Sequence, residues 1–88
     1  MNVRIDKSFE KDTKRIKDKI LLGKIAETIE HIQACIDSVE IKNLKKLKGS
    51  HRYYRIRIGS YRIGISIEEN TVIFIRVLPR KDIYKYFP

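Results

Sequence analysis

The chain has 88 residues, of which 35% are charged and 42% hydrophobic, and its net charge is +9. This length and balance predict one globular domain spanning residues 1–88 and exclude a disordered chain. The single cysteine, Cys35, excludes an internal disulfide and fits a reducing cytoplasm, and no cysteine–histidine spacing is typical of a zinc site. Charged residues from Arg4 onward argue against a signal peptide and a membrane span.

The positive charge is unevenly distributed along the chain. Residues 1–41 hold eight basic and eight acidic residues, whereas residues 42–88 hold twelve basic residues against Glu68, Glu69 and Asp82. The whole excess therefore lies in the second half of the chain. Such asymmetry favours a binding face over a generally basic surface.

In chain order, residues 2–5 are predicted to form a short strand, and Ser8 is predicted to cap a helix ending near Lys19. Gly23 is expected to mark the turn into a second, amphipathic helix. Each helix has an apolar stripe: Phe9, Thr13, Ile16 and Ile20 in the first, and Leu22, Ile25, Ile29, Ile32 and Ile36 in the second. We therefore expect an antiparallel helical hairpin packed on a sheet.

The second half predicts an antiparallel meander. Residues 37–51 form a lysine-rich connection without periodicity, and strands are expected at 52–58, 61–67 and 71–78. Gly59-Ser60 predicts a tight hairpin turn, and Pro79 ends the last strand. A short helix from about Lys81 is possible. The predicted fold class is α+β, in the order β-α-α-β-β-β, with a small, twisted and mostly antiparallel sheet.

Alternation along the three strands divides their side chains between two faces. The core face is predicted to contain Tyr54, Ile56, Ile58, Tyr61, Ile63, Ile65, Ile67, Ile73, Ile75 and Val77. The opposite face is predicted to contain Tyr53, Arg55, Arg57, Arg62, Gly64, Ser66, Val72, Phe74 and Arg76. We expect Gly64 to leave a gap on that face and no carboxylate to neutralise its arginines.

Arginines gathered with an aromatic ring on one face favour a planar polyanion, and nucleic acid is the obvious ligand. Guanidinium groups stay charged, bind phosphate oxygens through two hydrogen bonds and stack on bases. Like charges facing each other across strands destabilise a sheet, so this pattern is typical of a binding site. Solvated strand residues remain the structural alternative.

The second half resembles the RelE/ParE toxin superfamily. The resemblance rests on Leu47-Lys48-Gly49, Tyr54-Arg55-Ile56-Arg57, Gly59-Ser60-Tyr61-Arg62-Ile63 and Arg80-Lys81-Asp82-Ile83-Tyr84. With the β-α-α-β-β-β order it covers nearly the whole chain. The RelE branch cleaves messenger RNA in the ribosomal A site, and the ParE branch poisons DNA gyrase.

The resemblance implies roles for five residues that match the RelE pattern. These candidate catalytic residues are Arg55, Arg57, Arg62, Arg80 and Tyr84. Two departures stand out: Pro79 occupies a position often filled by histidine, and the Glu/His acid–base pair of some relatives is missing. Tyr84 could instead pack the C-terminal turn.

The implied activity is that of a ribosome-dependent endoribonuclease toxin of a type II toxin–antitoxin system, with no cofactor and no metal. Additional RNA-binding candidates are Lys45, Lys46, Lys48, Tyr53, Arg76 and Lys81. The lysines could equally form a hydrated loop, and Tyr53 and Phe74 could cover the sheet or dock a partner. The expected partners are a cognate antitoxin with an acidic, partly helical binding segment and the ribosome carrying messenger RNA. Two alternatives stay open: a ParE-like gyrase inhibitor and a non-catalytic RNA-binding protein of the same fold.

Overall fold

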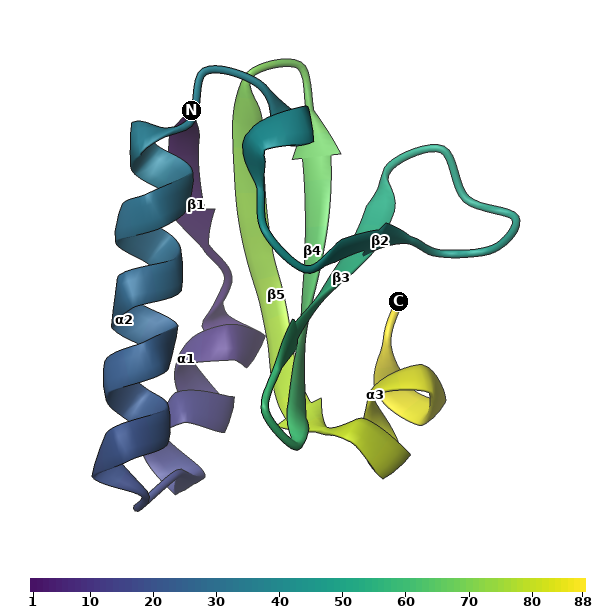
Figure 1. The fold of residues 1–88 in the computed structure, drawn as a ribbon. Helices are drawn as coiled ribbons and strands as arrows, with labels where there is room; N and C mark the ends of the chain where they lie inside the picture. The colour runs from purple at the N-terminus through teal and green to yellow at the C-terminus, as the bar shows by residue number, and fades with distance from the viewer.

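A computed structural model describes residues 1–88 as a five-stranded sheet with helices on both faces (Figure 1). The elements in chain order are β1 (Asn2–Ile5), α1 (Lys7–Arg15), α2 (Lys19–Ala34), the 3₁₀ turn η1 (Ser38–Glu40), β2 (Leu44–Lys46), β3 (Tyr53–Ile58), β4 (Tyr61–Glu68), β5 (Thr71–Pro79) and α3 (Arg80–Tyr86). The strand order is β1-β5-β4-β3-β2. Only β1 and β5 are parallel, so the predicted α+β class with a mostly antiparallel sheet is confirmed. None of the helices has the length and apolar character needed to cross a bilayer.

The predicted boundary between the first two helices was wrong. Asp6, not Ser8, caps α1, because its carboxylate accepts the Ser8 N–H. The second helix begins at Lys19, where the Asp18 carboxylate accepts hydrogen bonds from the backbone N–H groups of Ile20 (2.9 Å) and Leu21 (3.2 Å). Capping by Asp18 fixes the helix start. Gly23 consequently lies inside α2 and makes no turn.

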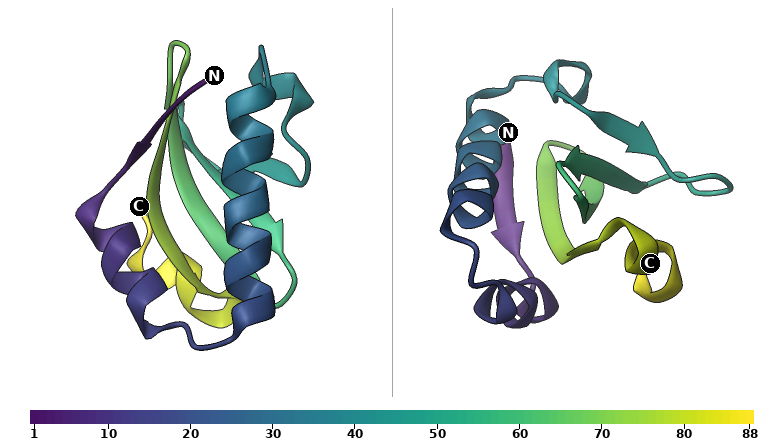
Figure 2. Two further views of the ribbon diagram at one scale, coloured as in Figure 1. Left: turned by 90° about the vertical axis from the view of Figure 1, so that its left-hand side faces the viewer. Right: turned by 60° about the horizontal axis from the view of Figure 1, so that its bottom comes forward.

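Helices α1 and α2 lie on one face of the sheet, called here the inner face, and α3 lies on the outer face (Figure 2). The inner core joins Phe9, Leu21, Ile25 and Ile32 of the helices to strand residues such as Ile56, Ile63 and Ile65. Two isoleucines of the predicted stripes lie outside this core and are exposed. Ile20 is 74% exposed in the first turn of α2, and Ile36 is 84% exposed beyond its last turn.

The lysine-rich connection contains a strand that the sequence did not predict. Leu44–Lys46 pairs antiparallel with β3, so Lys45 lies opposite Arg55. The added strand becomes the edge of the sheet, next to β3. Short edge strands with lysines are a common protection against intermolecular pairing.

A register shift between Gly64 and Ile65 changes the face assignments on β5. Gly64 pairs with Arg76 and Ile65 pairs with Phe74, so Ile75 is an extra residue opposite β4. A bulge of this kind inverts the alternation on one side of it. Val72 and Phe74 are therefore fully buried, whereas Ile73 and Ile75 are only half-buried. The predicted inward positions of Ile73 and Ile75 were wrong, and that of Val77 was right.

The predicted gap at Gly64 is filled by the C-terminal segment. Ile83 of α3 and Phe87 are buried on the outer face. A Cβ added to Gly64 would lie 2.6 Å from ring atoms of Phe87, so the ring contacts the backbone of β4 directly. Tyr53 meets the same ring edge-to-face, with centroids 5.6 Å apart. The Phe87 ring thus fills the space above Gly64, and no open gap exists there for a phosphate or ribose.

Candidate nucleic-acid interface

The tight turn between β3 and β4 places two arginines opposite each other on the outer face. Arg57 and Arg62 are direct cross-strand partners on either side of the turn at Gly59, which has φ +60°. Only glycine adopts that conformation without steric cost. Arg57 is exposed and Arg62 is buried, with 8% of its surface accessible. Like charges in direct opposition destabilise a hairpin, so the sheet alone does not explain this pair.

The Arg62 guanidinium is oriented by the turn itself. Its Nη1 donates to the carbonyl oxygens of Gly59 and Tyr61, both at 2.9 Å. Its Nε and Nη2 donate no hydrogen bond within the chain and remain available for an anionic ligand. Burial lowers the pKa of Arg62, and the charges of Arg55, Arg80 and Arg57 lower it further, against a small opposing effect of Tyr84. An arginine nevertheless stays protonated in proteins, so these charges remain concentrated.

Arg55 lies beside this pair on β3 and is also incompletely satisfied. Its Nη1 donates to the Asn43 carbonyl at 3.1 Å, whereas its Nε is buried without a hydrogen-bond partner. A buried donor without a partner is costly, and native proteins contain few of them. Such a donor in the centre of a basic face is consistent with a ligand that completes it.

The end of β5 and the start of α3 bring Arg80 and Tyr84 to the same end of the sheet. The Arg80 N–H donates to the Ser60 carbonyl at 2.9 Å, which ties the start of α3 to the β3–β4 turn. An open pocket of about 620 Å³ lies there, lined by Ser60, Pro79, Arg80, Lys81 and Tyr84. The Tyr84 side chain is 60% exposed. The five candidate catalytic residues thus lie together, and Arg55, Arg57, Arg62 and Arg80 are called here the guanidinium cluster.

Other predicted RNA-binding residues lie at varying distances from this cluster. Lys81 lines the same pocket, and Lys45 and Lys46 are exposed on β2. Lys48 lies in the loop that follows β2. Tyr53 is not a free stacking platform, because its ring contacts Phe87 and lies 5.1 Å from the Arg52 guanidinium.

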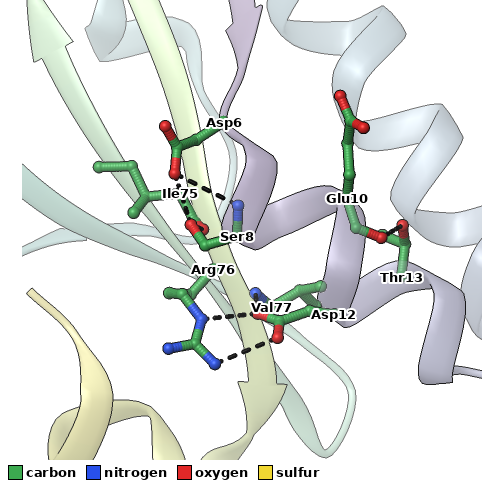
Figure 3. A network of polar contacts seen from close by, with 8 residues as sticks. All are labelled: Asp6, Ser8, Glu10, Asp12, Thr13, Ile75, Arg76 and Val77. Carbon is green, nitrogen blue, oxygen red and sulfur yellow. Dashed lines mark hydrogen bonds and ion pairs between the residues drawn. The ribbon is translucent and has the colours of Figure 1, made fainter.

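Arg76 is the exception among the predicted arginines, because a carboxylate neutralises it (Figure 3). Its Nε and Nη2 donate to the two carboxylate oxygens of Asp12, at 2.8 and 3.1 Å. The expectation of a face free of carboxylates was therefore wrong at this position. One sequence signal was overlooked: Asp12 lies between Phe9 and Ile16 at helical spacing, so it belongs to the apolar side of its helix.

The same carboxylate completes the open edge of β5. Beyond Ile5 the first strand ends, and Asp12 Oδ2 accepts the Val77 N–H at 3.0 Å. The Ser8 hydroxyl similarly donates to the Ile75 carbonyl at 2.6 Å. Side chains of α1 thus replace the missing strand along this edge, as Figure 3 shows. Ser8 serves this contact and not the helix cap that the sequence predicted.

A match to a known family identifies the class of protein to which this fold and this basic outer face belong. The family model described as the ParE toxin of type II toxin–antitoxin systems, parDE, matches residues 3–84. The chain belongs to this family, within the RelE/ParE superfamily.

Within the superfamily the chain is similar to RelE toxins. It is 47% identical to Toxin RelE3 of Methanocaldococcus jannaschii over the full length of both chains. It is 34% identical to Putative toxin RelE1 of the same organism, over 92% of this chain and 90% of the relative. The crystal structure of a RelB–RelE antitoxin–toxin complex from Methanococcus jannaschii matches with a TM-score of 0.80 and 45% identity, covering 97% of this chain and 99% of that chain. The predicted RelE-like membership of the superfamily is confirmed.

Proposed function

We propose that this toxin is a ribosome-dependent endoribonuclease that cleaves messenger RNA in the A site and inhibits translation. The observation that carries the proposal is the guanidinium cluster around Arg62. Its cations come from β3, β4 and the start of α3, and none of them forms an ion pair within the chain, since the only ion pairs are Arg52–Glu68 and Arg76–Asp12. Concentrated charge with free donors suits a ribose-phosphate chain.

The reaction consistent with these residues is a transesterification. The RNA 2′-oxygen attacks the adjacent phosphorus, the bond from phosphorus to the 5′-oxygen breaks, and a 2′,3′-cyclic phosphate remains. Arg62 and Arg80 would stabilise the negative charge that develops on the phosphoryl oxygens. Arg55 and Arg57 would hold the backbone, and one of them would assist the departing 5′-oxygen. Tyr84, as its phenolate, would accept the 2′-proton, or its ring would stack on a base.

Dependence on the ribosome follows from the weakness of this set as acid–base machinery. No Glu/His pair lies in the cluster, and Tyr84 is largely exposed. Positioning of the substrate can supply roughly 7–11 kcal/mol of a barrier. A ribosome that orients the messenger strand would supply this part, so free RNA should be cut poorly.

The test combines growth arrest with primer extension on cellular messenger RNA. Expression of the wild type should arrest growth and generate new messenger ends, and Arg62→Ala and Tyr84→Ala should lose both effects. Arg4→Ala is a matched control, since Arg4 is exposed on β1 at the far edge of the sheet. Growth arrest without new messenger ends would support the gyrase-directed alternative. Ribosome binding without either effect would indicate a non-catalytic RNA-binding protein.

A cognate antitoxin is the second part of the proposal. Structures with this fold include RelB–RelE antitoxin–toxin complexes, one from a relative 45% identical to this chain. The uncompensated charge of the outer face favours an acidic, partly helical segment that covers it. Affinity should then fall steeply between 50 and 500 mM salt, and a flat salt profile would contradict coverage of the basic face.

A further inference from the structure

Arg76 occupies a junction between three elements, although it was expected to contact RNA. Its side chain extends from β5, and its guanidinium forms an ion pair with the carboxylate of Asp12 on α1. The guanidinium also lies 6.0 Å from the ring centroid of Tyr86 in α3. Asp12 is 5% exposed and the Arg76 side chain 24% exposed. The hydrogen bonds that Arg76 donates to Asp12 are the main cause of its raised pKa. Arg76 is thus paired with a carboxylate, whereas the four arginines of the guanidinium cluster form no ion pair.

The element on the far side of Arg76 needs such support. α3 has seven residues and its N-cap, Pro79, makes no side-chain capping hydrogen bond. Helices this short are not stable by themselves, so tertiary contacts must hold them. The contacts are the buried Ile83, the Phe87 ring on Gly64, and the Tyr86 ring over Arg76. Between these anchors, α3 carries Arg80 and Tyr84.

We propose that Arg76 is a positioning residue: the Asp12–Arg76 pair fixes α3 through Tyr86 and thereby places Arg80 and Tyr84 against Arg62. The proposal rests on the proposed function, because Arg80 and Tyr84 matter through the reaction they would serve. It assigns Arg76 a role different from that of an RNA ligand.

The two roles of Arg76 predict opposite effects of Asp12→Asn. If Arg76 bound a phosphate, removing the neighbouring negative charge would strengthen RNA binding. If Arg76 positions α3, Asp12→Asn weakens the anchor and lowers kcat, as Arg76→Gln does. A phosphate ligand also contributes to the salt dependence of binding, whereas a positioning residue does not.

The experiment measures cleavage of ribosome-bound messenger RNA by full-length variants, together with ribosome binding at several salt concentrations. Asp12→Asn and Arg76→Gln should each lower kcat about threefold, the scale of the cation–π contact through which the pair holds α3, with KM and the salt slope unchanged. The double variant should be no worse than either single one, because both remove the same interaction. Tighter ribosome binding by Asp12→Asn, or a salt slope reduced by about one unit in Arg76→Gln with kcat unchanged, would overturn the proposal.

Variants at Tyr86 keep the test valid if the buried pair proves necessary for folding. Tyr86 is 61% exposed, so its replacement leaves the Asp12–Arg76 pair and the core intact. Tyr86→Leu should lower kcat about threefold, as expected for loss of an exposed cation–π contact, and Tyr86→Phe should retain wild-type kcat. Equal kcat for the wild type, Tyr86→Leu and Tyr86→Phe would overturn the proposed link between Arg76 and α3.

A readout without activity separates failure of this inference from failure of the proposed function. Amide hydrogen exchange reports the opening of α3, including the hydrogen bond from Phe87 N–H to the Ile83 carbonyl at 2.9 Å. Faster exchange across residues 80–87 in Tyr86→Leu and Asp12→Asn supports the anchor even if the wild type cleaves no RNA. Unchanged exchange in both variants would refute the anchor even if the wild type is an active ribonuclease.

Discussion

Arg62 and Arg76 lie on adjacent strands of the same outer face, yet their surroundings differ in every respect that matters for charge. Arg76 donates two hydrogen bonds to a buried carboxylate, and these bonds are the main cause of its raised pKa. Arg62 is more buried, has no carboxylate, and is surrounded by three further arginines that together with burial lower its pKa. The residue type and the face are shared, so only the partners distinguish a structural arginine from one available to a ligand.

This contrast shows which of the two arginines stabilises the fold and which lowers its stability. A compensated guanidinium at the edge of β5 joins α1 to the sheet, whereas an uncompensated cluster at the β3–β4 turn carries mutual repulsion. Sites that violate local rules without a structural benefit are commonly functional. The same substitution at the two arginines should therefore have different consequences.

Replacement of Arg76 by methionine should give the largest loss of stability. Arg76→Met leaves the Asp12 carboxylate buried without its partner, and breaking a buried ion pair costs about 3–5 kcal/mol. Urea unfolding at pH 7 measures this change, with Arg4→Met on the exposed surface of β1 as the control. A loss below about 1 kcal/mol would show that the pair does not stabilise the fold.

The same replacement at Arg62 should affect activity and spare stability. Arg62→Met removes a donor to the phosphoryl oxygens and should lower kcat by about 10²- to 10³-fold. Its free energy of unfolding should stay within about 1 kcal/mol of the wild type, because loss of repulsion offsets loss of two carbonyl hydrogen bonds. Destabilisation as large as that of Arg76→Met would remove the distinction between the two regions.

The packing of Phe87 on Gly64 links the surroundings of Arg62 to those of Arg76 through the C-terminal segment. Gly64→Ala places a methyl group against the Phe87 ring and should destabilise by about 1–3 kcal/mol while also lowering kcat through α3. Gly23→Ala is a matched control in an interior helical position with no heavy atom within 4 Å, and should stabilise by about 0.5–1 kcal/mol. Normal stability and activity of Gly64→Ala would show that the ring is easily displaced.

Removing an exposed capping carboxylate should have the smallest effect on stability. It provides a baseline against which the effect of breaking the buried Asp12–Arg76 pair can be compared. Backbone hydrogen bonds lower the pKa of Glu40, which closes a capping box at η1. Because the folded-state pKa is lowered from 4.5, this contribution to stability is present above that value and is lost as the pH falls through the lower folded-state pKa. Urea unfolding between pH 6 and pH 3 should show a shallower pH dependence for Glu40→Gln than for wild type. Identical profiles would contradict a role for the ionised carboxylate.

The fold class and most strand positions could be predicted because they follow from local patterns. Alternation predicted β3 and β4 almost to the residue, and Gly59-Ser60 predicted the turn between them. The phase of β5 could not be predicted, since the bulge at Ile75 exists only through pairing with β4. The start of α2 at Lys19 was missed because the cap formed by Asp18 was not recognised.

In the candidate site, too, the features that follow from local patterns could be predicted and those that depend on distant segments could not. The arginines near the turn were brought together by the meander itself, so alternation and the superfamily resemblance were sufficient to predict their proximity. The neutralisation of Arg76 depends on Asp12, 64 residues earlier in the chain, and the filling of Gly64 depends on Phe87 near the C-terminus. Contacts between distant segments of this kind leave no local periodicity, and the buried position of Asp12 on a helical stripe was the only trace.

The central claim is tested most directly with purified protein, programmed ribosomes and a messenger RNA bearing a single 2′-deoxynucleotide at the cleaved position. The account predicts cleavage of the all-ribose messenger to a 2′,3′-cyclic phosphate end, no cleavage of the 2′-deoxy messenger, and loss of cleavage in Arg62→Met. Equal cleavage of both messengers, or intact messenger under conditions in which the same protein inhibits DNA gyrase, would contradict it.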